Sequence, residues 1–87
     1  MGNEQKRIQE LESINSELAK EVLLNESAVF ETEKELLDID PDFKEHPEIK
    51  KHVHNLRILI KRIKNKNDIY KNEIFKNELE IKRLKND

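Results

Sequence analysis

Residues 49–84 read IKKHVHNLRILIKRIKNKNDIYKNEIFKNELEIKRL. Apolar, aromatic or amide side chains recur here at steps that alternate between four and three residues, which is the spacing of positions a and d in a coiled coil. The stretch contains neither proline nor glycine, so it predicts one long helix with a single apolar edge. The edge consists of Ile49, Val53, Leu56, Ile60, Ile63, Asn67, Tyr70, Ile74, Asn77, Ile81 and Leu84.

A second and more polar heptad pattern precedes this stretch. The residues around it are mostly Glu, Leu, Ala and Lys, which favour helix. The pattern therefore predicts a first helix from about residue 4 to about residue 39. Its positions are Ile8, Leu11, Asn15, Leu18, Val22, Asn25, Val29, Thr32, Leu36 and Ile39.

Both prolines of the chain lie between the two patterns. Proline breaks a helix, and it disfavours helical backbone at the residue before it. We therefore expect a break over residues 40–47 and a second helix over about residues 48–85, started by Pro47. Two helices with a short connection predict an all-α antiparallel hairpin that packs into a larger coiled-coil assembly. We expect Phe43 to cover the end of its core.

The two patterns can close into one seam. If Ile39 faces Ile49, every further layer pairs residues whose numbers add to 88 or 89. Asn25 and Asn67 then fall in adjacent layers, as do Asn15 and Asn77. A diagonal amide contact would relieve a burial cost of roughly 1–3 kcal/mol. The alternatives are amides that face water near splayed ends, or amides that meet their symmetry mates in a dimer. The residues expected to form the strongest part of the seam are Val29, Leu36, Val53, Leu56, Ile60 and Ile63.

Charge is divided unequally between the two halves of the chain. Residues 1–43 hold four basic and twelve acidic side chains, and residues 44–87 hold thirteen basic and seven acidic ones. An acidic helix beside a basic helix favours the hairpin and disfavours pairing of either helix with its own copy. Single surface pairs contribute about 0–1 kcal/mol each, so charge selects partners more than it stabilises.

Several apolar residues fall outside the seam. Leu23, Phe30 and Leu37 recur one heptad apart with Leu24 beside them, which predicts a second interface. We expect it to bind either a second hairpin or helices of another protein. The predicted partner-binding residues are Leu23, Leu24, Phe30, Leu37, Ile58, Ile69, Phe75 and Leu79.

The sequence offers no catalytic residues, cofactor site or metal site. It contains no cysteine, no phosphate-binding glycine loop and no zinc-binding helix motif. The histidines at positions 52 and 54 point about 200° apart on a helix and cannot chelate one metal together. No apolar run approaches the roughly 18 residues of a membrane span, and an intracellular location is expected, cytoplasmic or nuclear.

We therefore expect a non-enzymatic coiled-coil subunit or adaptor. One alternative is a nucleic-acid-associated protein that uses the basic run Lys61-Arg62-Ile63-Lys64, although the acidic helix and the net charge of −2 do not favour it. Another alternative is a helical chaperone that holds a client segment between its arms. A domain-swapped dimer opened near Pro41 is compatible with the same pattern.

Overall fold

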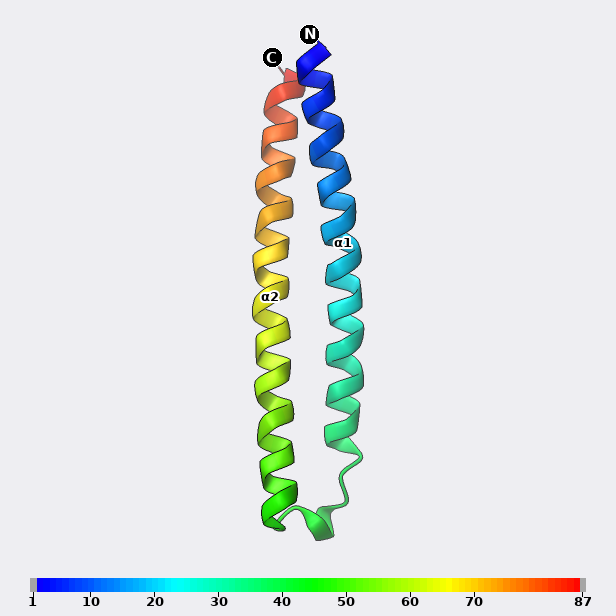
Figure 1. Ribbon diagram of the computed structural model, residues 1–87, viewed down its shortest axis with the longest axis vertical. Coiled ribbons are helices and arrows are strands. Elements are labelled where there is room, and N and C mark those ends of the chain that lie inside the picture. The colour runs from blue at the N-terminus through cyan, green and yellow to red at the C-terminus, as the bar shows by residue number, and fades with distance from the viewer. Residues whose placement is uncertain (1, 87) are drawn as a thin grey trace.

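The computed structural model describes residues 2–86 as two long helices, α1 (Gly2–Leu37) and α2 (Pro47–Asn86), joined through a short 3₁₀ helix, η1 (Pro41–Phe43). The two helices run antiparallel and side by side, so that both chain ends lie at one pole (Figure 1). The rod measures 66 × 15 × 14 Å. The predicted all-α antiparallel hairpin is confirmed.

The connection follows from its two prolines. Because Pro41 forces Asp40 into an extended conformation (ψ 127°), α1 ends at Leu37, two residues before the predicted end. The Asp40 carboxylate then accepts a 2.9 Å hydrogen bond from the backbone N–H of Asp42 and starts η1. His46 caps α2, because its Nδ1 accepts from the backbone N–H of Glu48 at 3.3 Å.

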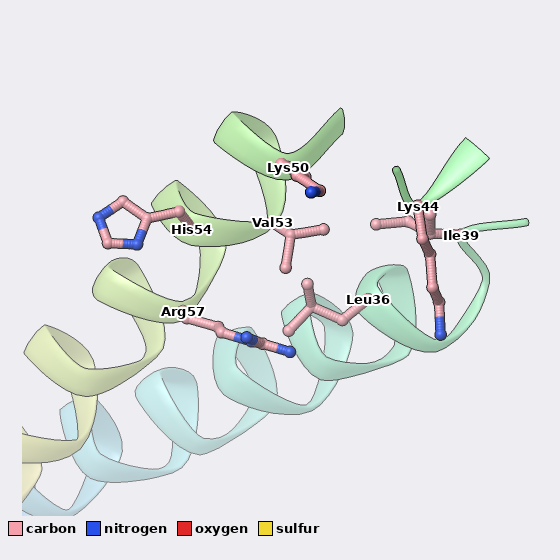
Figure 2. A pocket seen from close by; sticks show the side chains of 7 residues that line it. All are labelled: Leu36, Ile39, Lys44, Lys50, Val53, His54 and Arg57. Carbon is pink, nitrogen blue, oxygen red and sulfur yellow. The ribbon is translucent and has the colours of Figure 1, made fainter. Parts of the chain in front are cut away.

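The prediction for Phe43 is wrong. This residue lies in η1, and its side chain is 58% exposed, so it does not cover the end of the core. Ile39 closes this end of the core instead. It lies outside α1 yet is half-buried, and it lies with Leu36 and Val53 where the helices meet the connection (Figure 2).

Burial follows the heptad pattern along both helices. Every predicted seam position is buried or half-buried, and nearly all other described residues are exposed. Thr32 fits the seam because its hydroxyl donates a 2.7 Å hydrogen bond to the carbonyl of Ala28 on its own helix. The most deeply buried residues are Leu11, Val22, Val29, Ile60, Asn67 and Asn77.

Two amide pairs fix the register of the hairpin. Asn25 Nδ2 donates to Asn67 Oδ1 at 2.8 Å, and Asn77 Nδ2 donates to Asn15 Oδ1 at 2.9 Å. In both pairs the residue numbers add to 92. The predicted pairing has sums of 88 or 89, so the observed register of the two helices is shifted from the predicted one by one seam position. Both amide contacts expected from the sequence are therefore present, and the register makes the two asparagines of each pair level where a diagonal contact was expected.

Each pair also engages the backbone of the opposite helix. Asn67 donates to the Val22 carbonyl at 3.2 Å, and Asn15 donates to the Ile74 carbonyl at 3.3 Å. The two clusters are identical in pattern but exchange the roles of α1 and α2. Each residue of α1 thus corresponds to the residue of α2 numbered 52 higher, and the hairpin has an internal pseudo-two-fold axis.

Candidate interaction surface

Four ion pairs and one carboxylate–histidine contact, between Glu35 and His52, cross the seam and define the two sides of the hairpin. In heptad terms, three of them join e positions of both helices, and two join g positions, as expected for antiparallel helices. We call the corresponding surfaces the e side and the g side. The e-side pairs are Glu12–Lys85 (3.8 Å), Glu26–Lys71 (3.4 Å) and Glu33–Lys64 (3.3 Å), and the g-side pairs are Arg7–Glu80 (3.3 Å) and Glu35–His52 (3.3 Å).

The two sides differ in what lies between these pairs. On the e side, acidic residues of α1 face basic residues of α2 over most of the length. On the g side, the pairs lie toward the ends, and the middle contains the apolar residues Ile14 (45% exposed), Ala28 and Leu59 (44% exposed) together with the charged residues Glu21, Lys66 and Glu73. The g side is therefore the more apolar of the two beside the seam. The three apolar residues were missing from the predicted partner-binding set, and the signal that could have identified them is their shared heptad position.

The eight predicted partner-binding residues are all exposed, by 36% to 85%, and they do not form one surface. Heptad position assigns them to three outer rows, because residues at equal positions share one direction around a helix. Position b flanks the e side, position c flanks the g side, and position f lies opposite the seam. The b row holds Leu23, Phe30, Leu37 and Phe75, the c row holds Leu24 and Ile69, and the f row holds Ile58 and Leu79.

A cavity of about 380 Å³ lies at the closed end of the hairpin. Leu36 of α1 and Val53 of α2 point toward one another across it, and Ile39 lies beside them (Figure 2). Its charged lining is entirely basic and exposed, and comes from Lys44, Lys50, His54 and Arg57. An apolar floor with a basic rim suits an anionic group on an apolar body. All of its polar groups reach solvent, however, and the cavity is where the two helices diverge into the connection.

The basic run of α2 is divided among different directions. Lys64 faces Glu33 on the e side, Arg62 belongs to the row that flanks the g side, and Lys61 belongs to the row that flanks the e side. Consecutive basic residues therefore do not form one continuous strip. Of the neighbouring histidines, His52 pairs with Glu35 at 3.3 Å.

Within residues 2–86, no group of three or more His, Asp or Glu side chains is placed to hold a metal ion. Neither α1 nor α2 carries an apolar stretch long enough to cross a lipid bilayer. No protein-family model, curated protein or solved structure matches this chain. The surfaces of the hairpin are therefore interpreted from their own chemistry.

Proposed function

We propose that the chain is a non-enzymatic coiled-coil interaction subunit that binds further helices along its outer surface. The observation that supports this proposal is the contrast between a closed seam and the large apolar side chains that stay exposed on a mainly charged exterior. Among the described residues, no buried side-chain nitrogen or oxygen atom lacks a hydrogen-bond partner. The seam thus needs nothing further, whereas large apolar side chains such as Leu37 (85% exposed) and Ile69 (65% exposed) remain in water.

Helix packing is the mechanism that these residues support. Apolar residues recur at multiples of seven in the b row of α1 (Leu23, Phe30, Leu37) and in the f row of α2 (Ile58, Leu79), so they can pack against another helix in the way that a and d residues pack in the seam. Burial of an exposed leucine or phenylalanine contributes roughly 1.5–3 kcal/mol. A few such contacts suffice for an interface of moderate affinity.

The test is native mass with and without charged substitutions. The triple variant Leu24→Glu/Phe30→Glu/Leu37→Glu should keep its helix content, because all three side chains lie outside the seam, yet it should lose association with partners. Native mass is measured for the purified chain and for the chain in an extract of the cells that produce it. A mass of 10.4 kDa for both wild type and variant in both settings would contradict the proposal.

A further inference from the structure

The outer rows beside the g side are complementary in charge. From Glu10 onward the c row of α1 is acidic around a single leucine, and from Asn55 onward the c row of α2 is basic or neutral around a single isoleucine. Glu48, in the first turn of α2, precedes this part of the row and is acidic. The acidic row consists of Glu10, Glu17, Leu24 and Glu31 of α1 and of Asp38 directly after its end, and the basic row consists of Asn55, Arg62, Ile69, Lys76 and Arg83.

The complementarity extends to position along the axis. Residues at equal height on the two helices have numbers that add to about 92, as the amide pairs show. Each member of one c row can be matched with a member of the other so that their residue numbers add to 93. The two residues of each match therefore lie within one residue of equal height. Each acid is level with a base or an amide, and the two apolar residues are level with each other. The resulting pairs are Glu10 with Arg83, Glu17 with Lys76, Leu24 with Ile69, Glu31 with Arg62 and Asp38 with Asn55.

One hairpin cannot form these pairs within itself. Position c lies about 130° around the helix from the seam, so the two c rows form opposite edges of the g side. Within residues 2–86, Arg62, Lys76 and Arg83 form no ion pair, and Glu10 and Glu17 pair only with neighbours on α1. Leu24 and Ile69 are 64% and 65% exposed. The rows are matched yet unpaired.

We propose that two copies of this chain pack g side to g side as an antiparallel four-helix bundle. The two-fold axis runs parallel to the long axis of the rod, so α1 of each copy lies beside α2 of the other. Such a rotation preserves height, and it brings the acidic row of each copy against the basic row of its partner, twice. This inference rests on the proposed function and names its partner as a second copy.

Charge excludes the other two-fold arrangement of the same surfaces. An axis perpendicular to the rod would place α1 on α1 and α2 on α2, which brings acid to acid and base to base. Charge also selects the g side over the e side. On the e side, the same packing would place Leu23 level with Asp68 and Phe30 level with Lys61, so apolar residues would meet charges.

The available surface is large enough for a stable dimer. A face of a rod 66 Å long and 15 Å wide presents on the order of 1,000 Å² per copy, and specific interfaces bury about 1,200–2,000 Å² in total. Ile14, Ala28 and Leu59 lie in the middle of this face and would contribute apolar contacts between the charged rows, beside the charged residues Glu21, Lys66 and Glu73. Each helix would then pack against two antiparallel neighbours of opposite charge.

Row reversal tests the proposal by light scattering behind a sizing column. Wild type should have twice the 10.4 kDa of one chain. The acidic-row variant Glu17→Lys/Glu31→Lys and the basic-row variant Arg62→Glu/Lys76→Glu should each be monomeric, because either change places like charges opposite one another at two positions in each of the two contacts. An equimolar mixture of the two variants should recover the dimeric mass, since both contacts are then complementary again.

The matched control is Lys61→Glu/Lys82→Glu, which reverses two basic residues of α2 in the row beside the e side and should remain dimeric. A monomeric wild type at every concentration would overturn the inference, and so would a dimer that both row reversals leave intact. Neither result alone overturns the proposed function. The proposed function is contradicted only if wild type and the triple variant at Leu24, Phe30 and Leu37 both have a native mass of 10.4 kDa, as the purified chain and in the extract.

Discussion

The side-chain amide of Asn25 donates a 2.8 Å hydrogen bond to Oδ1 of Asn67, which is only 5% exposed inside the seam. Asn67 in turn donates a hydrogen bond from its side-chain amide to the Val22 carbonyl, so one side chain of α2 contacts α1 at two points. A shift of either helix by one seam position would bury both amides against apolar neighbours. The amide pairs therefore specify which layers meet.

Asn67→Ala should lower the free energy of unfolding by about 1–3 kcal/mol, because it leaves the half-buried Asn25 amide without its acceptor. Urea denaturation followed by circular dichroism measures this change. Asn72→Ala is the control, since Asn72 is an exposed residue of the same helix and its replacement should be neutral or slightly stabilising. Equal losses at both positions would show that the cluster contributes nothing beyond helix propensity.

The Glu33–Lys64 pair should carry a coupling energy of about 0.2–1 kcal/mol, since both side chains are roughly half exposed. Glu33→Lys alone should destabilise the hairpin by about that amount, and Glu33→Lys/Lys64→Glu should recover it. The double-mutant cycle is measured by urea denaturation at low and at about 1 M salt, where screening should remove the coupling. A coupling that persists unchanged in high salt would mean that the two residues interact through packing.

Ile60 and Ile69 provide a direct comparison of seam and exterior on one helix. Ile60→Ala should cost about 2–5 kcal/mol, because Ile60 is 9% exposed and its removal leaves a cavity. Ile69→Ala should change the free energy of unfolding of one hairpin by no more than about 0.5 kcal/mol. Thermal unfolding is followed at a concentration low enough for the wild type to be monomeric. Similar losses at both positions would contradict the observed burial.

Removal of residues 41–43 together with Pro47→Ala should convert the hairpin into an extended two-chain coiled coil. The deletion takes out Pro41 and η1, and it brings Ile39 and Ile49 one heptad apart, so the a/d pattern runs unbroken through the junction. A continuous helix of this length spans about 125 Å. Small-angle scattering should show a maximum dimension near that value, against 66 Å for the hairpin rod.

Pro47→Ala without the deletion is the matched control for the extended form. It keeps Pro41 and the out-of-phase spacing of the two patterns, so the compact hairpin should persist. An unchanged maximum dimension in the deletion variant would mean that the connection folds back without its prolines.

The seam was predictable because burial in a coiled coil follows directly from heptad position. Each residue predicted to face the partner helix, from Ile8 to Leu84, is at least half-buried. The pairing of asparagines was also visible in the spacing. Their exact level was not, since two alignments that differ by one seam position satisfy the same pattern of apolar residues. Only the geometry of the amide contact distinguishes them.

The exterior was less predictable. Leu23 and Leu24 are neighbours in sequence but flank opposite sides of the hairpin, so a list of exposed apolar residues merged two surfaces. Phe43 was misplaced because the sequence predicts a break over residues 40–47 but not the path of the chain within it, where a 3₁₀ turn leaves this side chain exposed. The matching of the two outer rows requires the register first, because heights on the two helices are undefined until the amide pairs set them.

Arg7 pairs with Glu80 and Glu12 with Lys85, so the described chain enters and leaves the rod at a single pole. Any segment attached there would leave the connection free at the far end, 66 Å away. In that arrangement the hairpin acts as a rigid spacer. It sets a fixed distance between an anchoring point and the end that carries the connection, and lengthening both helices by one heptad would extend that distance by about 10 Å without altering either end.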